Sequence, residues 1–80
     1  MITSDIKVPF LGDGIDKVTV CSWHRKPGDD IAQGEDVVEV EADKAVFNIP
    51  CEGRGRLKKI LIREGQEALI GQSIAIVENI

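Results

Sequence analysis

The sequence is poor in cysteine, histidine and aromatic residues. It has two cysteines, one histidine, one tryptophan, two phenylalanines and no tyrosine in 80 residues. Two cysteines are too few for a disulfide framework, and with one histidine they form no metal-ligand set. We interpret Cys21 and Cys51 as small core or semi-buried residues in a reducing compartment, with a redox pair as the alternative. Because aromatic residues are scarce, the hydrophobic core must be held together mainly by aliphatic side chains.

Long apolar runs and excess positive charge are also missing. No apolar stretch approaches the roughly 20 residues of a membrane span, and no signal peptide is recognisable. Ten basic residues against 14 acidic ones give a net charge of −4. This balance argues against nucleic acid and anionic membranes as partners. The length predicts one small domain over residues 1–80, which we expect to be monomeric.

Strand patterns dominate the middle of the chain, at residues 37–50. Val38, Val40 and Ala42 fall on one face of the first run, and Phe47 and Ile49 share a face in the second. Period-two patterning on both sides of a short polar centre predicts a β-hairpin.

The centre of this hairpin contains Asp43 and Lys44. No Asn-Gly or Gly-Gly pair is present, so the sequence argues against a primed two-residue turn. We expect a type I turn, which needs no positive φ, with Asp43 and Lys44 as its central residues. The Lys44 ammonium would then lie at the tip, in water.

The remainder of the chain alternates short strand patterns with turn signals. No stretch shows a sustained 3.6-residue period, so we predict an all-β sandwich or flattened barrel. The segment before residue 6 is expected to be a frayed lead-in, and turns or bends are expected at 27–34 and 64–67. The other predicted strands cover residues 6–9, 18–24, 57–62 and 73–77, and residues 51–55 are predicted to form a loop.

An internal repeat appears when the sequence is shifted by 37 residues. Gly28 then falls on Gly65 and Gly34 on Gly71, and Phe10 falls on Phe47. Two similar halves predict two similar sheets related by a pseudo-twofold axis. The turn with Lys44 would lie at one end of the molecule and both termini at the other, a geometry suited to a tethered carrier.

Several motifs resemble those of lipoyl domains, the carrier modules of 2-oxo acid dehydrogenase complexes. The run Glu41-Ala42-Asp43-Lys44-Ala45 resembles their Glu-Thr-Asp-Lys-Ala turn, with Ala42 in place of the frequent Thr. The segments 9–15 and 23–29 resemble the opening and the following strand and turn of the family, and Gly28 and Gly55 occupy the positions of its two characteristic glycines.

The resemblance implies a flattened barrel of two four-stranded antiparallel sheets, with lipoic acid attached to Lys44 through an amide. The residues that it assigns to recognition or turn geometry are Glu41, Asp43, Ala45, Gly28 and Gly55. We interpret Asp43 as a residue for turn geometry and enzyme recognition, because Asp tolerates such bends. The domain itself is expected to be non-catalytic, and His24 has no obvious partner.

The family implies partners for such a carrier. They are a thiamine-dependent 2-oxo acid dehydrogenase, an acyltransferase core that uses coenzyme A, dihydrolipoamide dehydrogenase, and a lipoate ligase or lipoyl transferase. The chain is expected to come from a longer dihydrolipoamide acyltransferase in the bacterial cytoplasm or the mitochondrial matrix. The pyruvate, 2-oxoglutarate and branched-chain complexes all remain open.

Two alternatives share this fold. A biotin carboxyl carrier domain usually has methionines beside its lysine, whereas Lys44 is flanked by Asp43 and Ala45. An unmodified adaptor domain would not need Lys44 in this turn motif. We therefore favour the lipoyl carrier.

Overall fold

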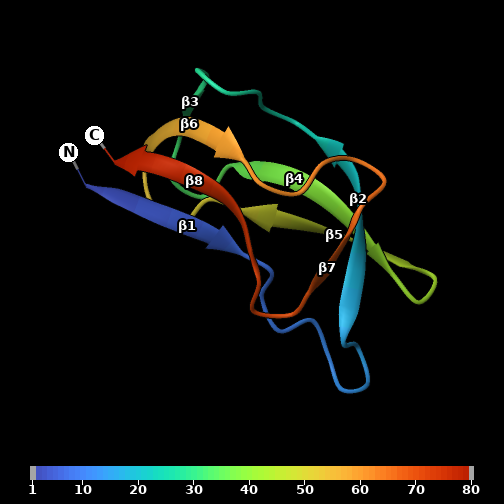
Figure 1. Ribbon diagram of the computed structural model, residues 1–80. Coiled ribbons are helices and arrows are strands. Elements are labelled where there is room, and N and C mark those ends of the chain that lie inside the picture. The colour runs from blue at the N-terminus through green and yellow to red at the C-terminus, as the bar shows by residue number, and fades with distance from the viewer. Residues whose placement is uncertain (1, 80) are drawn as a thin grey trace.

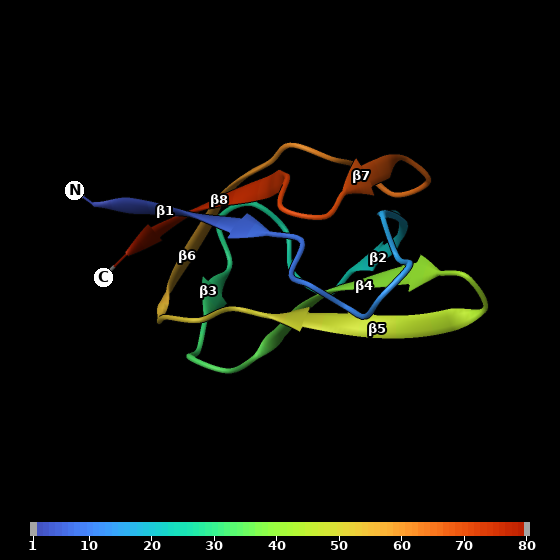
Figure 2. The same ribbon diagram turned by 90° about the horizontal axis from the view of Figure 1, so that it is seen from below.

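Two four-stranded antiparallel sheets form the domain in the computed structural model, which describes residues 2–79 (Figures 1 and 2). One sheet has the strand order β1-β8-β6-β3 and the other has the order β5-β4-β2-β7. This confirms the predicted all-β fold class. The strands are β1 (Thr3–Lys7), β2 (Lys17–Trp23), β3 (Asp30–Ile31), β4 (Asp36–Ala42), β5 (Ala45–Pro50), β6 (Gly55–Ile60), β7 (Glu67–Leu69) and β8 (Ser73–Asn79).

The core between the sheets is aliphatic, as the scarcity of aromatic residues requires. Val38, Val40 and Ala42 of β4 point into it, and the intervening Glu39 and Glu41 point outward. No polar or charged residue within 2–79 is buried. Removal of these aliphatic side chains from water is therefore the main favourable term in folding. The central members of the core are Val18, Val20, Ile31, Val37, Leu57, Ile74 and Val77.

The internal repeat corresponds to a structural pseudo-twofold relation, because β5-β4-β2-β7 repeats the order of β1-β8-β6-β3. Equivalent turns make equivalent hydrogen bonds: the Gly28 amide donates to the Leu57 carbonyl at 2.8 Å, and the Gly65 amide donates to the Val20 carbonyl at 2.8 Å. Both glycines have positive φ, 99° and 88°. These turns follow the predicted shift of 37 residues.

The edge strands β1 and β5 do not follow that shift. The Val8 amide donates to the Gln72 carbonyl, and the Cys51 amide donates to the Glu35 carbonyl in the corresponding place. Val8 is thus equivalent to Cys51. The sequence match of Phe10 with Phe47 is wrong as a structural equivalence, since Phe10 lies in the loop after β1 and Phe47 lies in β5.

Several strand boundaries differ from the expectation. Strand β1 starts at Thr3, within the segment predicted to be frayed, and it ends at Lys7 before Pro9. Strand β3 occupies two residues where a turn or bend was predicted, and the three-residue strand β7 begins at Glu67, the last residue of a predicted turn. Such short strands exist because β6 and β2 present backbone partners to them, and local residue type does not encode that pairing.

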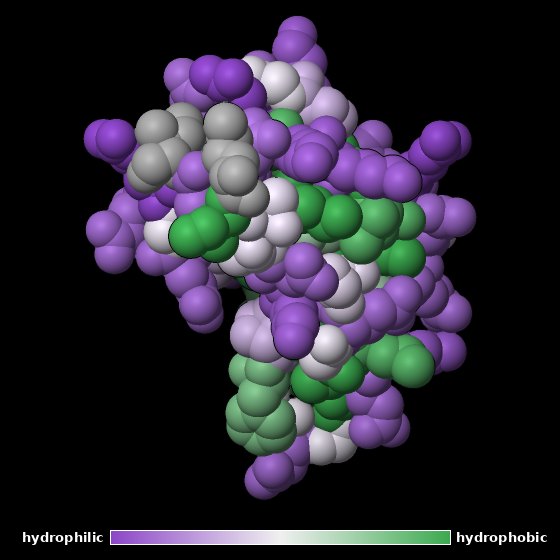
Figure 3. Space-filling model, turned by 60° about the vertical axis from the view of Figure 1, so that its left-hand side comes forward, coloured by the Kyte–Doolittle hydropathy of each residue, from purple (hydrophilic) through white to green (hydrophobic). Residues whose placement is uncertain are grey.

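The hairpin and the chain ends lie at opposite ends of the long axis. The domain measures 36 × 21 × 17 Å, and both views place the β4–β5 turn at one end and the two termini at the other (Figures 1 and 2). The chain-end side is covered largely by hydrophilic residues, with apolar side chains in separate patches (Figure 3). Within residues 2–79, no helix qualifies as a membrane span and no cluster of metal-ligating side chains is present.

Candidate functional site

The β4–β5 hairpin positions the candidate site. Its ladder pairs Glu41 with Val46 and Ala42 with Ala45, so only Asp43 and Lys44 remain in the connection. Ala42 is 5% exposed and anchors the base of the turn in the core. Asp43, Lys44 and Ala45 are exposed. The predicted position of Lys44 at a solvent-exposed tip is therefore confirmed.

The predicted type I geometry of this turn is wrong. Asp43 has a φ of 51° and Lys44 has a φ of 85°, which are the two positive values typical of a primed turn. A two-residue connection between strands takes this form because its twist matches the right-handed twist of the flanking strands. Asp tolerates a positive φ better than most residues, whereas Lys does not share that tolerance.

The environment of Lys44 leaves its amine available. The three ion pairs within residues 2–79 join other side chains: Lys17 with Glu67, Arg25 with Glu35, and Arg56 with Asp30. A shallow hollow beside the turn is lined by residues 14–17 together with Ala42 and Asp43. A group attached to the Lys44 amine would project away from the domain into solvent, which fits a covalently attached arm.

The two glycines singled out by the sequence lie away from Lys44 and have different roles. Gly28 has a φ of 99° in the turn before β3, which confirms its need for backbone freedom. Gly55 is not in a loop: it begins β6 and pairs with Asn79. A Cβ on Gly55 would lie 2.5 Å from the Glu78 carbonyl oxygen. Close strand packing requires glycine there.

The outer face of the hairpin sheet is acidic beside the turn. Glu39 and Glu41 point outward from β4, and Cys21 is exposed on the neighbouring strand β2. Partial desolvation, followed by the charges of Glu41 and Glu39, raises the pKa of the Cys21 thiol. The expectation that Cys21 is a core or semi-buried residue is therefore wrong.

Cys51 is buried, as expected, and its thiol donates a hydrogen bond to the Gly53 carbonyl. Both thiols are free.

His24 has a partner that the sequence did not suggest. Its Nε2 lies 2.8 Å from Oδ1 of Asn48, and this hydrogen bond joins the residue after β2 to β5. The two residues are 24 positions apart, and no local signal could have paired them. The contact connects strands that flank β4, which carries the candidate site at its end.

Known proteins resemble this chain in sequence and in fold. The profile of the Biotin_lipoyl family, described as "Biotin-requiring enzyme", matches residues 4–77. The dihydrolipoyllysine-residue succinyltransferase component of the 2-oxoglutarate dehydrogenase complex of Escherichia coli is 42% identical over 65 residues, which are 81% of this chain and 16% of that protein. This chain thus spans about a sixth of the curated relative.

Two solved structures resemble this chain, one in both sequence and fold and the other in fold alone. The solution structure of the lipoyl domain of the Azotobacter vinelandii 2-oxoglutarate dehydrogenase complex is 34% identical, covers 91% of this chain and 92% of that one, and has a TM-score of 0.73. A single-chain, multi-domain long-chain acyl-CoA carboxylase has a TM-score of 0.83 at 18% identity, over 98% of this chain and 7% of that one. The second likeness concerns the fold alone.

Proposed function

Because the chain belongs to the family of biotin- and lipoyl-bearing domains, we propose that Lys44 carries a lipoyl group through an amide bond. The chain is a lipoyl carrier domain of the kind found in the acyltransferase components of 2-oxo acid dehydrogenase complexes. The carboxylase likeness does not favour biotin, since the shared fold holds either group. The neighbours of Lys44, Asp43 and Ala45, match the lipoyl motif.

The single observation that supports the site is the placement of Lys44 on a two-residue turn at the end of the molecule opposite the termini. Ala42 and Ala45 pair across the base of the turn, so the root of the arm has a defined position. When bound, the lipoyl group would supply a dithiolane that accepts an acyl group by reductive acylation and releases it to coenzyme A. Amidation also removes the positive charge of Lys44.

We assign the partners from the family as part of the same proposal. The domain would meet a thiamine-dependent 2-oxo acid dehydrogenase, an acyltransferase core and dihydrolipoamide dehydrogenase, after modification by a lipoate ligase or lipoyl transferase. Tethering keeps the attached group at a roughly millimolar effective concentration near each active site. The named relatives favour the 2-oxoglutarate complex, and hence a succinyl cargo. We place the domain in the bacterial cytoplasm or the mitochondrial matrix as part of the same proposal.

The proposal is tested by intact-mass analysis after co-expression with a lipoate ligase and lipoate. We expect a lipoyl-sized mass gain that disappears in Lys44→Arg. Lys17→Arg is the matched control, because Lys17 is also an exposed lysine close to the turn, and it should keep the gain. A biotin-sized gain with biotin ligase alone would overturn the lipoyl assignment. No gain with either enzyme would favour an unmodified adaptor.

A further inference from the structure

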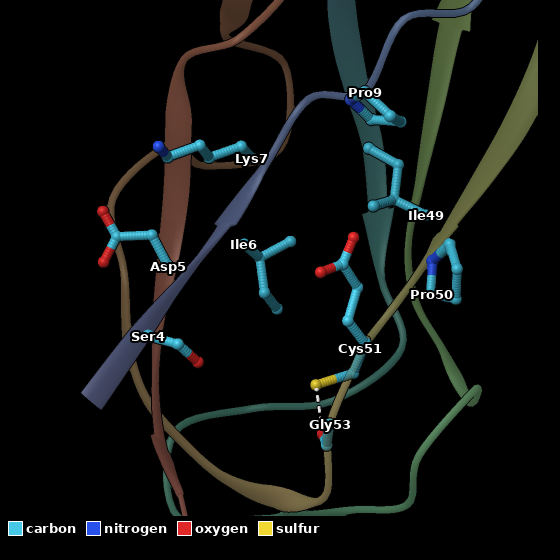
Figure 4. A pocket seen from close by; sticks show the side chains of 10 residues that line it. Ser4, Asp5, Ile6, Lys7, Pro9, Ile49, Pro50, Cys51 and Gly53 are labelled. Atoms are coloured by element: carbon cyan, nitrogen blue, oxygen red, sulfur yellow. Dashed lines mark hydrogen bonds between the residues drawn. The ribbon is translucent and has the colours of Figure 1, made fainter. Parts of the chain in front are cut away.

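Two hollows lie where the two halves of the repeat meet. One, of about 310 Å³, lies between β1 and the end of β5, and its floor is formed by the apolar Ile6, Ile49 and Cys51 (Figure 4). The other, of about 520 Å³, is lined by residues 23–26 and Asp29 on one side and by Ile60, Arg63 and Glu64 on the other. We refer to the second as the β2–β6 hollow, because it lies at the ends of these two strands.

The turns on either side of the β2–β6 hollow make equivalent hydrogen bonds. The Lys26 amide donates to Oδ2 of Asp29 at 3.0 Å, and the Arg63 amide donates to Oε1 of Gln66 at 2.7 Å. Lys26 and Asp29 fall on Arg63 and Gln66 under the shift of 37 residues. Each bond of one half therefore has a defined equivalent in the other, and a missing equivalent can be recognised.

One hydrogen bond at this hollow breaks the equivalence. The Trp23 amide donates to Oε2 of Glu64 at 2.9 Å and not to the neighbouring strand β4. The residues equivalent to Trp23 and Glu64 are Ile60 and Pro27, and proline has no side-chain oxygen that could accept a hydrogen bond. Among residues 2–79 no side chain accepts from the Ile60 amide, which is left as a donor at the hollow.

The indole of Trp23 creates a second difference between the halves. Its Nε1 donates to the Ile62 carbonyl at 2.9 Å. The equivalent residues are Ile60, which has no side-chain donor, and Arg25, whose carbonyl therefore lacks the corresponding partner. One side of the hollow is thus closed by a carboxylate and an N–H group, and the other side presents a free backbone donor and a free backbone acceptor.

Positive charge surrounds this unfilled side. Four exposed cations that belong to no ion pair of residues 2–79 line the hollow or precede Ile60 on β6: Lys26, Lys58, Lys59 and Arg63. The two carboxylates of the hollow, Asp29 and Glu64, each accept a hydrogen bond from a backbone amide. The excess of cations favours an anionic group at the free donor.

We propose that the β2–β6 hollow is a docking site for an acidic, extended segment of a partner polypeptide. A carboxylate of that segment accepts from the Ile60 amide, in the role that Glu64 has in the other half, and a backbone N–H of the segment donates to the Arg25 carbonyl. Lys26 and Arg63 add charge-assisted contacts. A free carboxylate ion offers no N–H group to the Arg25 carbonyl, so the pair of free backbone groups favours a polypeptide.

The docking site lies away from the proposed attachment point. Trp23 is opposite Val38 in the sheet, and Val38 is six positions from Lys44, or about 20 Å along the strand. A short segment bound at the hollow therefore leaves Lys44 uncovered. The inference goes beyond the proposed function and does not depend on it, since every contact that it uses is present in the unmodified chain.

The first test follows the amide NMR signals of the unmodified domain during titration with a peptide of four glutamates that is acetylated and amidated at its ends. Ile60 and the turn at residues 25–29 should shift, and the shifts should become smaller as salt is raised. A peptide of four glutamines is the matched control and should leave these signals unchanged. Equal shifts with both peptides, or shifts confined to other residues, would overturn the proposal. Acetate that bound as tightly as the glutamate peptide would show a site for small anions and would overturn it as well.

The repeat itself supplies a variant that fills the site. Pro27→Glu places a carboxylate at the position equivalent to Glu64, so it should cap the Ile60 amide, slow its hydrogen exchange and abolish its response to the glutamate peptide. Pro27→Ala is the matched control, because it removes the proline without adding an acceptor, and it should keep the response. A folded Pro27→Glu variant that bound the peptide as the wild type does would contradict the assigned site.

Charge variants measure the part played by the cations. Lys26→Gln and Arg63→Gln should each weaken binding of the glutamate peptide about two- to fivefold, which corresponds to the usual strength of an exposed ion pair. Lys7→Gln is the control, because Lys7 is exposed on β1 and lines the other hollow. If Lys7→Gln weakened binding as much as the other two variants, the attraction would be a general effect of charge and the docking site would be refuted.

Discussion

At the scale of single residues, the positive φ values of Asp43 and Lys44 are conformationally unfavourable. We attribute them to the function of the site. Asn-Gly would adopt two positive φ values with less strain, yet this position holds Asp-Lys. A non-glycine residue in this region stores of the order of 1–3 kcal/mol, and such strain is often found at functional sites. The amine that the proposed attachment requires therefore takes precedence over the best turn residue.

Replacement of Lys44 by Gly should therefore stabilise the fold. We expect a gain in the free energy of unfolding of about 1 kcal/mol, because glycine adopts the observed φ freely, with a rise in Tm of about 4–8 °C. Thermal and urea denaturation of the unmodified domain measure this. Lys58→Gly is the control: Lys58 is exposed in β6 and has no positive φ, so its replacement should lower stability. A destabilised Lys44→Gly would contradict the turn geometry.

Gly55 is the residue whose substitution should be most harmful. In Gly55→Ala the new Cβ would lie 2.5 Å from both the Glu78 carbonyl oxygen and Val77 Cγ1, and we expect a loss of about 2 kcal/mol or more. Gly53→Ala is the matched control, since its Cβ would meet only the Asn79 amide nitrogen at 3.7 Å. Its effect should remain within about 0.5 kcal/mol. Chemical denaturation distinguishes the two, and equal effects would rule out the packing argument.

At the scale of elements, β2 and β4 form an acidic outer surface next to the hairpin. The register places Thr19 opposite Glu41 and Ser22 opposite Glu39, with a bulge that contains Cys21 between them. The two carboxylates have no ion-pair partner among residues 2–79. Their negative charge disfavours a thiolate on the same surface, which is the second cause of the raised Cys21 pKa after desolvation.

This surface predicts the reactivity of Cys21. A raised pKa leaves less thiolate at a given pH, so alkylation by iodoacetamide should reach its half-maximal rate at a higher pH than for a small free thiol. Glu39→Gln together with Glu41→Gln should move the rate profile to lower pH, because two of the causes are removed. Glu67→Gln is the control. Mass spectrometry of the peptides reports each site separately, and an unchanged profile in the double variant would exclude the carboxylate effect.

At the scale of the whole molecule, charge is divided unequally along the long axis. The hairpin end, defined as residues 11–19, 39–46 and 67–69, contains six acidic side chains and two lysines. The remainder then has eight acidic and eight basic side chains. The entire net charge of −4 thus lies at the end that carries Lys44, and the proposed amidation of Lys44 would make that end more negative.

This asymmetry predicts that the domain, once lipoylated as proposed, is steered electrostatically toward a basic active-site entrance of its proposed partner. We expect kcat/KM for reductive acylation by the 2-oxo acid dehydrogenase to fall as ionic strength rises. Glu41→Gln should lower kcat/KM about two- to threefold at low salt, with little change in kcat. Glu52→Gln, in the half that contains the chain ends, should have little effect. A salt-independent kcat/KM would show that the charge of this end does not guide the encounter.

The sequence by itself determined the strand pattern, the aliphatic core and the exposed lysine between two paired runs. Period-two alternation at Val38, Val40 and Ala42 is a local property, so the face that each residue presents could be predicted. The repeat of Gly28 at Gly65 likewise marked equivalent turns, because a positive φ favours glycine wherever it occurs.

Only the tertiary structure decided the features that depend on distant partners. The positive φ values of Asp43 and Lys44 follow from closure of the ladder at Ala42 and Ala45 and from the twist of the sheet, which act against the local preference of lysine. The hydrogen bond between His24 and Asn48 depends on strands joined through β4. The hollow at the end of β5 exists because two edge strands from different sheets meet there.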